Sequence, residues 1–119
     1  MRTIDYNGYV PDHDAMNHDA VVCEIQARAR ARGVLSHYCG PSLRCTGDRG
    51  KPDLVLVGNF GVAWIEVKMP GDCLDPEQTR WRYKLRAAGQ LVETMGPGDL
   101  VAGGAVDQLL ELAALGAVA

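Results

Sequence analysis

The chain has 119 residues and a formal net charge of −3, and 47% of its residues are hydrophobic. This length suits one domain built around one hydrophobic core. The sequence holds no apolar run near the roughly 20 residues that cross a bilayer, and its first residues lack the apolar segment of a signal peptide. Composition therefore predicts a cytoplasmic protein without a membrane partner.

The four cysteines are spread along the chain without a C-x-x-C pair or a dense disulfide pattern. They are Cys23, Cys39, Cys45 and Cys73. Free thiols in a reducing compartment are the expectation for such spacing.

The sequence pI of about 5.5 argues against a nucleic-acid partner, because domains that bind phosphates are usually basic. The charge is unevenly distributed, however. Six basic and two acidic residues lie between Glu24 and Lys51, and four basic and two acidic residues lie between Asp75 and Ala88. The mean charge is therefore a poor guide to the local electrostatic potential.

The first predicted element follows an N-terminal arm. Residues 1–16 lack apolar periodicity and are interpreted as this arm, followed by a single domain over residues 17–119. We interpret His13 and His18 as parts of a solvated loop and a helix start rather than as metal ligands. A helix is predicted from about residue 18 to residue 32, with Val22 and Ile25 on its apolar face and Glu24 on the border of that face.

Three strands are predicted next. A short strand near residues 35–39 precedes an irregular basic segment, and strands at 54–57 and 62–68 are joined by the turn sequence GNFG. A hairpin with this turn pairs Val57 with Val62. The same register places Asp53 directly opposite Glu66.

The remaining pattern predicts helix, strand and helix. Asp75-Pro76 starts a helix that ends at Gly89, residues 90–95 form a strand, and residues 106–115 form a leucine-rich helix. The fold class is thus α/β, with a mixed sheet of about four strands flanked by helices in the order α-β-β-β-α-β-α. Trp64 and Trp81 are expected in the core.

Two carboxylates placed opposite each other on neighbouring strands destabilise a sheet unless they share a proton or bind a cation. Lys68 points to the same side of its strand as Glu66. Asp53, Glu66 and Lys68 together match the needs of metal-assisted phosphodiester hydrolysis. The alternative from spacing alone is a plain salt-bridge cluster at the end of a strand.

The segments GKPDL, residues 50–54, and IEVK, residues 65–68, resemble the PD-(D/E)xK nuclease signature. With the downstream Gln78, Trp81 and helix-glycine-strand order, the chain is similar to the VRR-NUC (virus-type replication and repair nuclease) family from about residue 18 to residue 115. The resemblance implies a restriction-endonuclease-like fold and a Mg²⁺ cofactor, with Mn²⁺ as an alternative.

The resemblance also assigns residues to roles. Asp53 and Glu66 become metal ligands, the Val67 carbonyl a third ligand, and Lys68 the catalytic lysine. Glu24 matches the acidic residue of the first helix of the family and would join the metal site; the alternative is a salt bridge with Arg28, one turn along the helix.

Gln78 has two interpretations. It lies on one stripe of its helix with Trp81, Leu85 and Ala88, which favours an active-site role facing the core. The alternative is a capping box with Asp75. Basic side chains at the rim are candidates for phosphate contacts, with Arg82 and Arg86 on the solvent-facing side of the helix; they are Arg44, Arg49, Lys51, Arg80, Arg82, Lys84 and Arg86.

The resemblance implies, as the leading hypothesis, a Mg²⁺-dependent DNA endonuclease from bacteria or phage-infected cells that cleaves branched DNA such as Holliday junctions or flaps. It would act as a homodimer, with the leucine-rich last helix either as the dimer element or packed on its own sheet. The alternatives are a sequence-specific restriction-type nuclease and a non-catalytic nucleic-acid-binding module of the same fold. A small-molecule metallohydrolase is disfavoured, because no pair of histidine ligands is evident.

Overall fold

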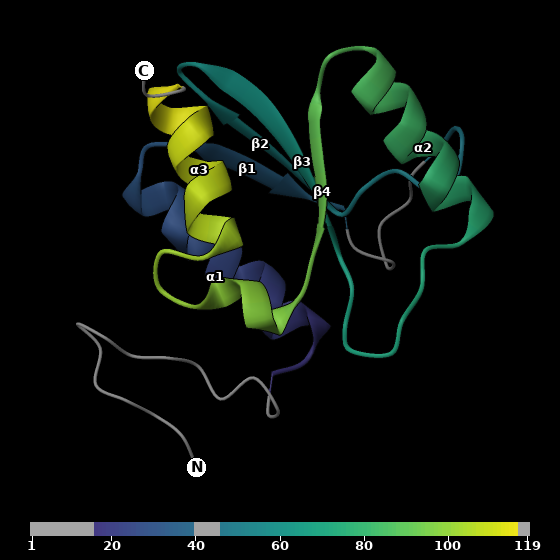
Figure 1. Cartoon of the computed structure of the whole chain (residues 1–119), viewed down its shortest axis with the longest axis horizontal. Coiled ribbons are helices and arrows are strands. Elements are labelled where there is room, and N and C mark those ends of the chain that lie inside the picture. The colour runs from purple at the N-terminus through teal and green to yellow at the C-terminus, as the bar shows by residue number, and fades with distance from the viewer. Residues whose placement is uncertain (1–15, 40–45, 117–119) are drawn as a thin grey trace.

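A computed structural model of the protein describes residues 16–39 and 46–116 (Figure 1). The predicted N-terminal arm lies almost wholly outside this range, and Arg44 and Cys45 lie outside it as well. The elements follow one another in the order α1 (His18–Ala31), β1 (Leu35–Tyr38), β2 (Leu54–Gly58), β3 (Gly61–Val67), α2 (Pro76–Ala87), β4 (Leu91–Met95), η2 (Pro97–Leu100) and α3 (Ala105–Leu115). This order confirms the prediction, to which it adds the short 3₁₀ helix η2.

The sheet has four strands in the order β1-β2-β3-β4. The first three strands are antiparallel, whereas β4 runs parallel to β3, because α2 carries the chain back across the molecule between them. Val57 pairs with Val62 and Leu54 with Ile65, as the turn sequence predicted. The hairpin register therefore brings the residue before β2, Asp53, level with Glu66.

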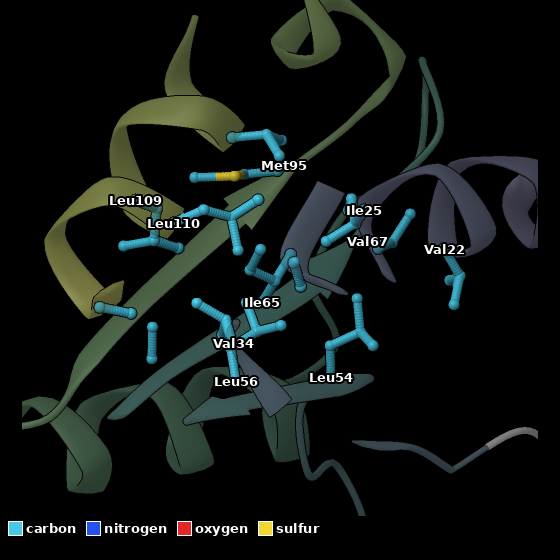
Figure 2. Packing of buried hydrophobic residues seen from close by; sticks show 14 of the residues in the cluster. Val22, Ile25, Val34, Leu54, Leu56, Ile65, Val67, Met95, Leu109 and Leu110 are labelled. Carbon is cyan, nitrogen blue, oxygen red and sulfur yellow. The ribbon is translucent and has the colours of Figure 1, made fainter. Parts of the chain in front are cut away.

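One face of the sheet carries the hydrophobic core. Figure 1 shows α1 and α3 together on one side of the molecule and α2 apart from them. The alternate side chains Leu54, Leu56 and Ile65 point into the core, where they pack with Ile25 of α1 and Leu110 of α3 (Figure 2). This packing fixes the strands that carry the carboxylates.

Helix α3 packs mainly on its own sheet. Val106, Leu109 and Leu110 are buried in the core, which corresponds to the second of the two predicted roles for this helix. Leu112 and Leu115 remain 39% and 63% exposed.

Helix α2 lies beside β4 and buries no side chain completely. Of its predicted inward stripe, Gln78, Trp81 and Leu85 are half-buried, while Ala88 is exposed. Trp64 is also half-buried, and its indole N–H donates a hydrogen bond of 3.1 Å to the Gln90 side chain. The prediction that both tryptophans lie in the core is thus wrong, because α2 covers the sheet loosely.

The cysteines differ from the expectation. Cys23 and Cys73 are free and exposed, but Cys39 is disulfide-bonded, so the prediction of four free thiols is wrong. Disulfides are rare in the cytosol, and the cytoplasmic location stays a prediction. None of the helices within residues 16–39 and 46–116 is long and apolar enough to cross a membrane.

Candidate active site

Two carboxylates meet at the ends of β2 and β3. Asp53 precedes β2 and Glu66 is the penultimate residue of β3, and Glu66 is only 6% exposed. The backbone N–H of Val67 donates a hydrogen bond of 2.8 Å to Oδ2 of Asp53. The backbone of one strand thereby fixes the carboxylate of the other.

Glu66 has an unusually high pKa for a carboxyl group. The pKa of Glu66 is raised to about 8, mainly by burial and also by the charge of Asp53 and a hydrogen bond with its side chain. Lys68 acts in the opposite direction, while Asp75 adds a smaller increase. Without a cation, the carboxylate pair therefore retains a proton at neutral pH.

The carboxylates open into a cleft of about 620 Å³. Val67 and Lys68 line it beside them, so the aspartate, glutamate and lysine of the nuclease signature share one cavity, as predicted. Asp72, Asp75 and Glu77 contribute further acidic side chains to its wall.

The donor set suits a divalent cation. Asp53 and Glu66 offer hard carboxylate oxygens, and the crowding that protonates Glu66 would be relieved by a positive ion between them. Within the described residues, no three His, Cys, Asp or Glu side chains already stand in a metal-holding arrangement. Metal binding would thus need a reorientation of side chains, with the Val67 carbonyl as a candidate backbone ligand.

Gln78 forms the predicted capping box and also contacts Glu66. Its side-chain amide donates a hydrogen bond of 3.1 Å to Oε2 of Glu66. Its side-chain oxygen accepts from the backbone N–H of Asp75 at 3.0 Å, and the Asp75 carboxylate accepts from the backbone N–H of Gln78 at 2.8 Å. The capping box thereby locks the amide that contacts Glu66.

Glu24 does not line the cleft with the signature residues. Arg28 Nε donates a hydrogen bond of 2.9 Å to its carboxylate, and Arg28 also lies 3.3 Å from Asp107 of α3. The alternative salt bridge is therefore what the structure contains. The metal role that the resemblance gave Glu24 has no support in this geometry.

Helix α1 brings His18 to the cleft instead. Nε2 of His18 lies 3.3 Å from Oδ2 of Asp53. The sequence interpretation gave His18 only a place at the helix start, although helical spacing puts it on the same face as the buried Val22 and Ile25. This position on the buried face of the helix was the sequence signal that could have placed His18 at the site.

The basic residues fall into three groups. Arg49 and Lys51 line the cleft, whereas Arg80 and Lys84 border a separate cavity of about 200 Å³ beside Trp81. Arg44 lies outside the described residues.

Arg82 and Arg86 form the third group. Arg86 donates a hydrogen bond of 2.9 Å to the backbone oxygen of Val92 and lies 3.6 Å from Glu93. Nε of Arg82 is buried. Arg86 is exposed, as predicted, whereas Arg82 is half-buried and differs from the prediction, because β4 lies next to α2.

Comparison with known proteins bears on this site. No protein-family model matches the chain, and no curated protein matches it in sequence. A solved structure described as a VRR_NUC domain is similar to it, with 26% sequence identity and a TM-score of 0.61, over 82% of this chain and 97% of the other. The predicted resemblance is thereby confirmed, and the chain has the restriction-endonuclease-like fold of a VRR-NUC nuclease domain.

Proposed function

We propose that this protein is a divalent-metal-dependent DNA endonuclease that hydrolyses phosphodiester bonds. The observation that carries the proposal is the meeting of Asp53 and Glu66 in a cleft that Lys68 also lines. A VRR-NUC fold supports a nuclease of the PD-(D/E)xK superfamily and a DNA partner. The metal, the choice of DNA and the residue roles are our inference.

Asp53 and Glu66 would hold Mg²⁺ or Mn²⁺ through carboxylate oxygens, with the Val67 carbonyl beside them. A bound cation of this kind polarises the phosphate and makes water a better nucleophile. The Val67 N–H keeps the Asp53 carboxylate oriented, and Gln78 does the same for Glu66. Lys68 places a positive charge in the cleft, where it would orient the attacking water and offset charge on the phosphate.

Arg49 and Lys51 line the same cleft as Lys68, and we propose that they contact DNA phosphates next to the scissile bond. Arg80 and Lys84 on α2 would extend this contact. Because the protein carries a net charge of −3, DNA binding should be modest and sensitive to salt.

Branched DNA is the proposed substrate, in replication, repair or recombination in a bacterial or phage-infected cell. A homodimer would provide paired active sites for two cuts. The exposed Leu112 and Leu115 on α3 are candidates for its interface.

The decisive experiment treats linear, nicked, flapped and four-way DNA with purified protein in Mg²⁺, in Mn²⁺ and in chelator. Cleavage is expected only with metal and mainly on branched DNA. Asp53→Asn, Glu66→Gln and Lys68→Ala should each abolish it, whereas Glu111→Gln, a carboxylate change in the surface salt bridge with Arg32, should not. Cleavage that survives in all three site variants would refute the active-site assignment.

The same assay separates the rival functions. Cleavage of linear duplex that follows base sequence would favour a restriction-type nuclease. If calorimetry detects no cation binding and no DNA is cut, the protein is a non-catalytic nucleic-acid-binding module.

A further inference from the structure

We propose that His18 is a metal ligand of this site, and that its imidazole nitrogen makes the site prefer Mn²⁺ over Mg²⁺ more strongly than carboxylates alone would. The proposal rests on the proposed function, because it concerns the same cation. It gives α1 a direct part in the site, which Glu24 does not take because it is paired with Arg28.

The position of the ring supports ligation. His18 is the first residue of α1, lines the cleft, and holds Nε2 3.3 Å from Oδ2 of Asp53. That separation is long for a hydrogen bond between nitrogen and oxygen. Two ligands at right angles on one ion, each about 2.2 Å from it, lie about 3.1 Å apart. The two side chains therefore already have nearly the spacing of neighbouring ligands.

The other ring nitrogen has a suitable partner. Nδ1 of His18 lies 4.0 Å from Oδ1 of Asp19, whose side chain is 80% exposed and free to move closer. Histidine ligands commonly donate their second N–H to a carboxylate, which fixes the tautomer and leaves the first nitrogen ready for the metal. A small shift of Asp19 would complete that arrangement.

The ring also has an aromatic neighbour. The rings of His18 and Tyr38 lie with their centroids 6.3 Å apart, and Tyr38 lines the same cleft. Asp53, whose carboxylate lies beside His18, itself accepts a hydrogen bond from the Val67 N–H. Nε2 thus lies close to a carboxylate that already has a fixed direction.

A nitrogen ligand changes the choice of metal. Mg²⁺ strongly favours oxygen ligands and bound water, whereas first-row transition metals accept imidazole. Removal of the imidazole should therefore weaken the binding of Mn²⁺ much more than the binding of Mg²⁺.

The test is a calorimetric titration of the full chain with MnCl₂ and, separately, with MgCl₂. In His18→Ala and in His18→Asn, whose amide retains a hydrogen-bond donor near Asp53, we expect Mn²⁺ affinity to fall by about tenfold or more. Mg²⁺ affinity should change by less than about threefold, so the ratio of the two affinities falls. His37→Asn, at an exposed position of β1, is the matched control and should keep the wild-type ratio.

Spin-echo spectroscopy of the bound Mn²⁺ gives a second readout that does not depend on activity. A modulation from a directly bonded nitrogen is expected in the wild type and in His37→Asn, and it should vanish in both His18 variants. Absence of this signal in the wild type, or an unchanged affinity ratio in both His18 variants, would overturn the proposal.

Failure of His18 as a ligand and failure of the proposed function give different results. If Asp53→Asn abolishes binding of both cations while the His18 variants change neither, His18 is not a ligand and the proposed function stands. If the wild-type protein binds neither cation, the proposed function itself fails.

Discussion

The side-chain amide of Gln78 lies 3.1 Å from the buried carboxylate of Glu66, and the same side chain closes the capping box with Asp75 at the start of α2. Hydrogen bonds within the first turn of α2 thus determine the direction of the side chain that contacts Glu66. Helix initiation and the orientation of Glu66 are coupled through one residue.

This coupling predicts a difference between two substitutions. Gln78→Ala removes the capping contact and leaves Glu66 without its amide donor, so it should lower the free energy of unfolding by about 1–2 kcal/mol and reduce cleavage strongly. Asp75→Ala weakens the cap by a similar amount but keeps the amide beside Glu66. Urea unfolding and cleavage rates measure the two effects, and equal losses of cleavage in both variants would show that the Gln78 amide has no role beside Glu66 apart from the cap.

Glu24→Gln tests whether the first acidic residue of α1 stabilises the fold or serves the site. Its partner Arg28 is 10% exposed and also contacts Asp107, so the loss of this salt bridge should cost up to about 1 kcal/mol of unfolding free energy. Metal affinity measured by calorimetry should stay at the wild-type value. A large fall in metal affinity would instead return Glu24 to the site.

The raised pKa of Glu66 predicts that the metal-free protein loses stability as the pH rises. The folded protein keeps the Glu66 proton up to a pKa of about 8, whereas the unfolded chain releases it near the ordinary value of 4.5. Because the folded state binds more protons between these values, this group's contribution to the free energy of unfolding decreases from pH 4.5 to pH 8.

Urea unfolding in chelator at several pH values between 5 and 9 measures this trend. Glu66→Gln removes the titrating group and should flatten the profile. A wild-type profile no steeper than that of Glu66→Gln would show that the pKa of Glu66 is not raised.

The backbone of Gly50 lies so close to the start of α2 that there is no room for a side chain. We therefore expect the site to depend on this glycine. Its φ is +97°, and a Cβ there would lie 2.6 Å from the Glu77 carbonyl oxygen and 2.7 Å from the Gln78 backbone nitrogen. Gly50→Ala should therefore separate the loop that carries Lys51 from α2. We expect a loss of about 1–3 kcal/mol in unfolding free energy and weaker DNA binding.

Gly47→Ala is the matched control for this change. Gly47 also has a positive φ, +111°, but a Cβ there would meet nothing within 4 Å. It should carry only the conformational cost, with DNA affinity retained in a fluorescence-anisotropy titration. Equal losses of DNA affinity in both variants would mean that the contact between Gly50 and α2 does not position the site.

Local sequence determined the elements and the centre of the site. Hydrophobic periodicity and the glycine turn determine the hairpin, and its register follows from the turn, so Val57 pairs with Val62 and Asp53 comes level with Glu66. The capping box of α2 is likewise a contact within four residues. These features depend on neighbours in the chain, which is why the sequence alone predicted them.

Tertiary structure decided which partners the polar residues of α1 contact. Glu24 and His18 both lie on α1. Glu24 pairs with Arg28, which also contacts Asp107 of α3, whereas His18 lies beside Asp53 in the cleft. Asp107 is 79 residues from Arg28 in the chain, and Asp53 is 35 residues from His18. Helical phase gives the direction of a side chain, but its partner comes from whichever distant element packs there, and only the folded chain specifies that.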